Sequence, residues 1–123
     1  MTTNDLVGKK FDIVLVDPWD FVTTNGSGPF VADVIRVGHD KSTGVESLVL
    51  GLALPLKYKT EEFRYFMATT RHEGRTFQQV LSGEQVGCNL TGIPTERLQG
   101  GDLFDMSWWR GGAAAIADLS LHK

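Results

Sequence analysis

Three acidic side chains are candidates for metal binding or acid–base chemistry. They are Asp17, Asp20 and Asp105, which flank aromatic segments of the chain. Paired carboxylates can bind a hard cation or carry out acid–base catalysis. Asp17 and Asp20 surround Pro18, however, and an aspartate in such a setting commonly stabilises a turn through backbone amides. The sequence contains no calcium-binding loop. We therefore expect turn-stabilising carboxylates and predict no metal site.

A second group of titratable residues is the run from Arg71 to Arg75, which includes His72 and Glu73. A histidine beside a carboxylate can act as a general base. Adjacent turn residues usually point apart, and the sequence identifies neither a nucleophile nor a substrate pocket to accompany them. The run predicts a solvated charged turn whose arginines can meet an acidic group on a partner, with Arg71 and His72 as candidate binding residues.

Other reactive or ligand-binding patterns are weak. The single cysteine, Cys88, lies between Val86 and Leu90 on the inward face of an expected strand, where a cysteine behaves as a small hydrophobic residue. Glycines 26 and 28 precede a proline and a strand, not a helix and a lysine, so they do not form a phosphate-binding loop. His39 and His122, placed in a turn and near the terminus, lack metal-ligand spacing. We predict no catalytic residue and no cofactor.

The most distinctive segments hold the three tryptophans, Trp19 in one and Trp108 and Trp109 in the other. Consecutive strand residues face opposite ways, so Trp108 and Trp109 cannot both enter a core. Tryptophan and arginine dominate the energetics of protein interfaces. We therefore expect Trp19, Trp108, Trp109 and Arg110 to plug one end of the fold, to form a binding surface, or to do both. We also expect Trp19 to pack against Trp108 or Trp109, and Arg110 to pair with an aspartate.

These residues must be positioned by short β-type runs separated by glycine-containing turns. Alternating apolar residues predict strands at 11–16, 30–37, 45–54, 62–69 and 85–90, with a turn at 40–44. Residues 104–109 fit a strand or a tight loop, 93–101 is irregular, and 115–121 fits a helix or, over 116–121, an edge strand.

Two details of these elements carry specific expectations. In the third strand, Leu48, Leu50, Leu52 and Leu54 should share one face, Gly51 should mark a bulge or a close backbone approach, and Pro55 should end the strand. The helix is expected near 76–82, because Thr76 and Gln79 have capping-box spacing and Gly83 suits a helix end.

The fold class that follows is all-β or β-dominated. We predict a small antiparallel barrel or sandwich of five to six strands with one short helix near 76–82. The connections are too short for repeated parallel crossovers. The chain of 123 residues is expected to form a single domain over 1–123.

The charge and composition of the chain exclude some classes of binding partner. The net charge is −3 and no lysine or arginine cluster is dense enough to follow a phosphate backbone, so no nucleic-acid binding is expected. The longest apolar stretch, 48–56, is too short to cross a bilayer, and the first residues do not have the layout of a signal peptide. The expected location is the cytoplasm.

Three functions fit these observations. The first is a non-catalytic domain that binds another protein, and many bacterial toxin-neutralising (immunity-type) proteins share its small size and acidic charge, a comparison of size and composition alone. The second is a small-molecule-binding β-barrel or a small enzyme with Asp, His and Glu side chains in a cavity. The third is a self-assembling structural domain that pairs through an edge strand at 116–121.

Overall fold

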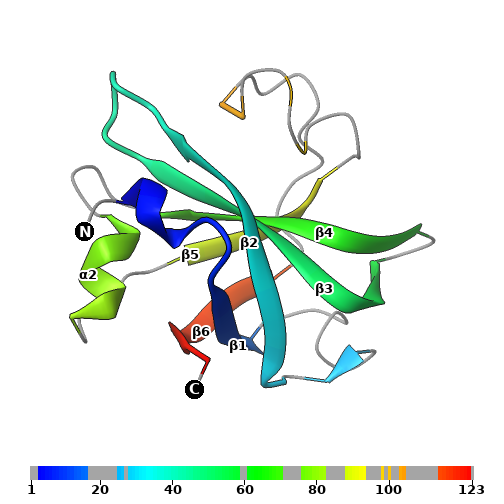
Figure 1. Ribbon diagram of the computed structural model, residues 1–123. Helices are drawn as coiled ribbons and strands as arrows, with labels where there is room; N and C mark the ends of the chain where they lie inside the picture. The colour runs from blue at the N-terminus through cyan, green and yellow to red at the C-terminus, as the bar shows by residue number, and fades with distance from the viewer. Residues whose placement is uncertain are drawn as a thin grey trace.

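A computed structural model gives the fold of this chain and describes residues 3–16, 25–26, 28–58, 61–70, 76–82, 88–93, 98, 100, 103–104 and 114–122. Six strands pair antiparallel in chain order and close into a barrel (Figure 1). The elements are η1 (Thr3–Leu6), β1 (Lys10–Val16), β2 (Phe30–His39), β3 (Glu46–Tyr58), β4 (Glu61–Thr70), α2 (Phe77–Leu81), β5 (Cys88–Gly92) and β6 (Ala114–Leu121). The predicted β-dominated class is confirmed, and the barrel rather than the sandwich is its form.

The barrel closes through the pairing of β1 with β6, in which Phe11 lies opposite Leu121 and Val16 lies opposite Ala115. On its other side β6 pairs with β5, with Cys88 opposite Ile116. The strand reading of 116–121 is confirmed, although its alanine-rich sequence also suits a helix. The expected edge position is wrong, because closure places β6 between two neighbours and removes the edge on which the self-assembly alternative relied.

The antiparallel order gives the barrel two different ends. At one end, which we call the loop end, lie Val16, Phe30, Tyr58, Glu61, Gly92 and Ala114. At the other, which we call the helix end, lie Lys10, His39, Glu46, Thr70, Cys88 and Leu121. The two short helices, η1 and α2, both lie at the helix end (Figure 1).

Apolar side chains fill the interior of the barrel. In β1, inward Phe11, Ile13 and Leu15 are buried and alternate with less buried residues, as a strand with one core face requires. The interior cluster consists of Leu6, Phe11, Ile13, Leu15, Ala32, Val34, Leu48, Leu50, Leu52, Leu56, Phe66, Ala68, Phe77, Leu90 and Leu119. The helices contribute Leu6 and Phe77, so both help to close the core at the helix end.

A second cluster, which we call the outer cluster, covers part of the outside of the sheet. Val49 and Met67 are buried there beneath Ile93 and Leu103, with Ile35, Tyr65, Leu98 and Phe104 packed around them. Nη1 of Arg36 donates a hydrogen bond to the carbonyl of Gly100 at 3.1 Å. The described residues that follow β5 therefore lie over the outside of the sheet near β2, β3 and β4; they are Ile93, Leu98, Gly100, Leu103 and Phe104.

The third strand differs from its prediction in two ways. Its register with β4 jumps from Gly51 opposite Tyr65 to Leu56 opposite Phe63, so residues 52–55 face only one residue of β4. This bulge leaves Leu54 exposed, and its predicted place on the buried leucine face is wrong. Pro55 does not end the strand, because a proline within a bulge has no ladder position that requires its missing N–H.

Gly51 marks the start of that bulge and a close approach, as predicted. A Cβ atom at Gly51 would lie 2.8 Å from Cδ1 of Ile35 and 3.2 Å from Cε1 of Tyr65. The side chains of the outer cluster therefore occupy the space that any larger residue at this position would need.

The other predicted elements are largely confirmed. The strands at 11–16, 30–37 and 62–69 are present with small extensions, the fifth strand spans Cys88–Gly92, and α2 lies within 76–82. The backbone N–H of Thr76 donates to Oε1 of Gln79 at 3.0 Å, which is the expected capping contact. Gly83 and the side chain of Cys88 lie outside the described part. No helix of the described residues is long and apolar enough to cross a membrane.

Candidate functional site

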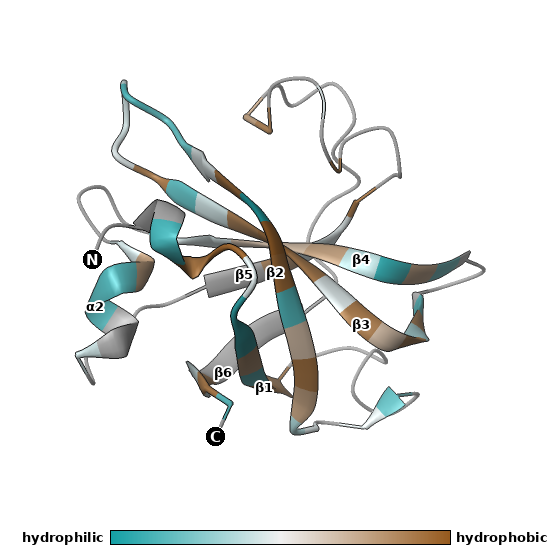
Figure 2. Ribbon diagram, viewed as in Figure 1, coloured by the Kyte–Doolittle hydropathy of each residue, from teal (hydrophilic) through white to brown (hydrophobic). Residues whose placement is uncertain are grey.

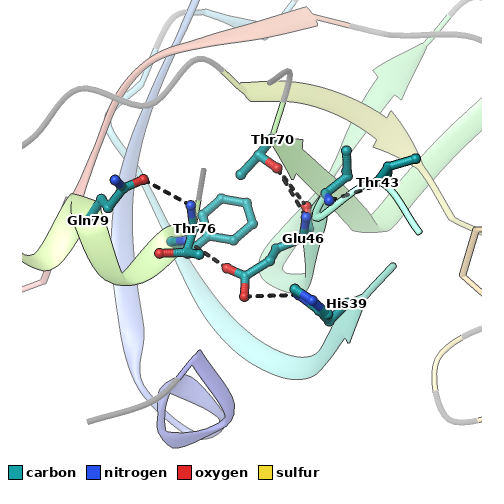
Figure 3. A network of polar contacts seen from close by, with 8 residues as sticks. His39, Thr43, Glu46, Thr70, Thr76 and Gln79 are labelled. Atoms are coloured by element: carbon teal, nitrogen blue, oxygen red, sulfur yellow. Dashed lines mark hydrogen bonds and ion pairs between the residues drawn. The ribbon is translucent and has the colours of Figure 1, made fainter. Parts of the chain in front are cut away.

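Glu46 is the centre of a polar network at the helix end (Figure 3). It is the first residue of β3 and is only 5% exposed. Its Oε1 accepts a hydrogen bond from the backbone N–H of Phe77 at 2.9 Å, and its Oε2 lies 3.4 Å from Nδ1 of His39. Phe77 is the first residue of α2, whose N–H has no partner within the helix. A carboxylate at this position caps the helix, and its negative charge interacts favourably with the positive end of the helix dipole.

The β2–β3 turn brings His39 and Glu46 together. Asp40 accepts hydrogen bonds from the backbone N–H and the hydroxyl of Ser42 and from the hydroxyl of Thr43. The Thr43 hydroxyl first, and then the Ser42 donors, lower the pKa of Asp40. The predicted turn at 40–44 is confirmed, and its closure places His39 directly opposite Glu46. His39 itself is the last residue of β2 rather than a turn residue.

Thr70 holds the end of β4 to the start of β3. The backbone N–H of Glu46 donates to Oγ1 of Thr70 at 3.0 Å, and the same hydroxyl lies 3.5 Å from the carbonyl oxygen of Glu46. Both residues are buried. Glu46 therefore joins three elements, because its backbone contacts β4, its carboxylate caps α2, and its second oxygen faces the end of β2.

The chemistry available to this network is limited. A carboxylate beside a half-exposed histidine is the arrangement of an acid–base pair. The hydroxyl of Thr43 donates to Asp40, and the hydroxyl of Thr70 accepts from the N–H of Glu46. These contacts hold the turn and the strand ends in place. A nucleophilic hydroxyl would instead need a base that takes its proton during the reaction. Among the described residues, no group of three or more His, Cys, Asp or Glu side chains could hold a metal ion. The contacts of the network serve to fix α2 on the barrel.

Sequence reasoning did not select Glu46 or identify its role. The available signal is a glutamate at the start of a strand that is otherwise strongly apolar. A buried carboxylate requires a partner, but the partner here is a backbone N–H far along the chain, which no local pattern reveals.

The loop end presents apolar side chains to solvent. Leu54 is 75% exposed, Val16 51% and Val31 42%, and they belong to the neighbouring strands β3, β1 and β2. Ala53 and Pro55, on either side of Leu54, are also exposed. We call Val16, Val31, Ala53, Leu54 and Pro55 the apolar rim. Figure 2 shows hydrophobic residues in the outer part of β3 near its label.

Next to the apolar rim, the side chain of Asn25 pairs with the backbone of β3. Its Nδ2 donates to the carbonyl of Lys57 at 2.7 Å, and its Oδ1 accepts from the N–H of Lys57 at 2.8 Å. On the opposite side, residues 56–58 of β3 pair with β4. The Asn25 carboxamide thus takes the position that a neighbouring strand would take.

The predicted binding residues fall in connections from both ends of the barrel. Trp19 follows Val16 along the chain, and Trp108, Trp109 and Arg110 precede Ala114. Because Val16 pairs with Ala115, the strands to which these two segments are attached are neighbours at the loop end. Arg71 and His72 follow Thr70, which lies at the helix end.

All six predicted binding residues lie outside the described residues, as do Asp17, Asp20, Glu73, Arg75 and Asp105. The packing of Trp19 against Trp108 or Trp109, and the pairing of Arg110 with an aspartate, stay predictions. Comparison of the chain with protein-family models, curated proteins and solved structures found no match.

Proposed function

We propose that this chain is a non-catalytic, cytoplasmic domain that binds another protein at the loop end. The observation that carries the proposal is the run Ala53-Leu54-Pro55, which is exposed between buried Leu52 and Leu56. The register jump of β3 against β4 turns this run outward, although simple alternation would bury Leu54. Contact with a partner would remove this apolar surface from water.

The tryptophan segments add to this surface in the proposal. Both are attached to paired strands at the loop end, next to exposed Val16. Trp19, Trp109 and Arg110 are of the residue types that contribute most to interface energy. A basic protein partner, such as a toxin that the domain would neutralise, suits the net charge of −3.

The packed interior favours a surface function over the small-molecule alternative. Phe11, Phe66 and Phe77 are among the largest fully buried side chains, and all three belong to the interior cluster. Barrels that bind a small ligand inside must leave space that side chains do not fill. The Glu46 network likewise serves the attachment of α2, which gives the acid–base alternative little support.

Capture of a partner from a lysate of the source organism tests the function. Leu54→Asp places a charge in the centre of the apolar rim and should lower capture about tenfold or more if Leu54 is a central contact. Val7→Asp is the matched control, because Val7 is 51% exposed but follows η1 at the helix end. Trp109→Ala tests the adjoining segment in the same way.

Circular dichroism should confirm that each variant keeps its β-structure. Loss of capture by Leu54→Asp with retention by Val7→Asp supports the proposal. Equal capture by the wild type, Leu54→Asp and Trp109→Ala would overturn it.

A further inference from the structure

The pairing of Asn25 with Lys57 shows which groups the edge of β3 can bind at a point where no strand of the described residues covers it. A carboxamide has the same C=O and N–H groups as a peptide bond. Here it binds both the N–H and the C=O of one residue, at 2.8 and 2.7 Å. In an antiparallel ladder, this double exchange is what a residue on a neighbouring strand makes.

The part of this edge without a strand partner among the described residues is short. The pairing of β3 with β2 covers residues 46–52, and its pairing with β4 covers 47–51 and 56–58. Residues 53–55 therefore have no strand partner on either side among the described residues. Lys57 has a strand on one side and the Asn25 side chain on the other.

We propose that the edge of β3 from Ala53 to Lys57 pairs with an extended segment of a partner protein, which replaces the Asn25 carboxamide at Lys57. Strand addition takes its affinity from backbone hydrogen bonds and its specificity from alternate side chains. At this edge Lys57 supplies a backbone donor and acceptor, and exposed Leu54 supplies an apolar contact. The inference rests on the protein-binding function proposed above and adds the chemistry of the partner.

Pro55 limits the register of this pairing. It has a carbonyl but no N–H, so it can accept a hydrogen bond from the partner but cannot donate one. An incoming strand would then have its reciprocal pair at Lys57. Proteins also use proline, lysine and covering side chains to protect an edge from pairing. Peptide binding distinguishes a receptive edge from a protected one.

The probe is an acetylated and amidated hexapeptide in which valine alternates with lysine, which matches the basic partner proposed above. Its binding is followed by NMR through the backbone amides of Leu54 and Lys57. Asn25→Ala removes the competing carboxamide and should tighten binding about tenfold, since two neutral hydrogen bonds no longer have to be broken. Asn25→Asp keeps the acceptor for the Lys57 N–H but loses the donor, and should give an intermediate affinity.

A second probe tests whether the backbone is what binds. The same hexapeptide with methylated backbone nitrogens cannot donate to the Lys57 carbonyl and should bind at least tenfold more weakly. Equal affinity of wild type and Asn25→Ala, or equal binding of the methylated peptide, would overturn the pairing edge. The capture experiment with Leu54→Asp stands apart from this result, because that surface can bind a partner without strand addition.

Light scattering without peptide provides the remaining outcome. Asn25→Ala should stay at the mass of the wild type. Formation of a dimer by this variant alone would overturn the assignment to a different protein and give the edge to a second copy of the chain.

Discussion

Glu46 and Phe77 are joined by a hydrogen bond that spans 31 residues of the chain, with the Phe77 N–H donating to Oε1 of Glu46 at 2.9 Å. Helix α2 has five residues, and a helix this short is unstable in isolation. Its stability must come from its contacts with the barrel. Phe77 provides two such contacts, because its N–H binds the carboxylate of Glu46 and its buried ring packs in the interior cluster.

Removal of the Glu46 carboxylate should destabilise the fold. Glu46→Ala leaves the N–H of Phe77 buried without this acceptor, and we expect a loss of about 1.5–3 kcal/mol in the free energy of unfolding. Glu46→Gln keeps an acceptor oxygen and should lose less. Urea unfolding measures both. Equal stability of wild type and Glu46→Ala would show that the cap is not required.

Replacement of the hydroxyls under the outer cluster should stabilise the protein. Ser47 and Thr69 lie opposite each other on β3 and β4, and their buried hydroxyl oxygens have no hydrogen-bond partner among the residues that the structure describes. The double variant Ser47→Ala, Thr69→Val removes two unsatisfied polar groups at nearly constant volume. We expect a gain of about 1 kcal/mol or more, seen as a higher melting temperature. A lower melting temperature would contradict the expectation and indicate that the hydroxyls are satisfied in solution.

Gly92 should resist substitution because of the ring of Phe63. A Cβ atom at Gly92 would lie 2.8 Å from Cγ and from Cδ1 of that ring, which itself packs edge-on against Phe66 with centroids 5.9 Å apart. Gly92→Ala should therefore cost about 1–3 kcal/mol. In a Phe63→Leu background the same substitution should cost clearly less, and a double-mutant cycle measures the coupling. Additive effects would count against this close contact.

Asp40 should titrate below the ordinary aspartate range, because the hydroxyl of Thr43 and then the donors of Ser42 stabilise its charged form. A pKa that is lower in the folded state than in the unfolded chain gives stability that is present above the unfolded value of about 3.9. This contribution is lost as the pH falls through the folded pKa. The Asp40 carboxyl carbon, followed by NMR, should show a midpoint below about 3.9.

A matched variant isolates the Thr43 contribution. Thr43→Val removes the largest cause of the shift, so the Asp40 pKa should rise toward the ordinary value. An unchanged midpoint in Thr43→Val would contradict the assigned cause.

The strands were predictable because each has its own apolar alternation. In β1 the pattern of Phe11, Ile13 and Leu15 directly matches the buried face, and the Thr76–Gln79 spacing located α2. The leucine periodicity of β3 gave the buried face correctly up to Leu52. It failed at Leu54 because the bulge depends on the pairing with β4, which local sequence does not encode.

The candidate site was less predictable because its contacts join distant segments. The Asn25-Gly26 pair predicts a turn, but nothing near it indicates that the Asn25 side chain binds the backbone of Lys57. The same limit applies to Glu46 and Phe77. Trp19, Trp108, Trp109 and Arg110 were predicted as binding residues from their types alone. The strands that adjoin these segments in the sequence, β1 and β6, are paired, with Val16 opposite Ala115.

The seam between Phe11 and Leu121 has a consequence for synthesis on the ribosome. Strands β1 to β4 can form hairpins as they emerge, because each pairs with the next along the chain. The last partner of β1 becomes available only when Leu121 has been made. Until then, the nascent sheet keeps an open strand that is vulnerable to aggregation, and association with a chaperone during translation would protect it.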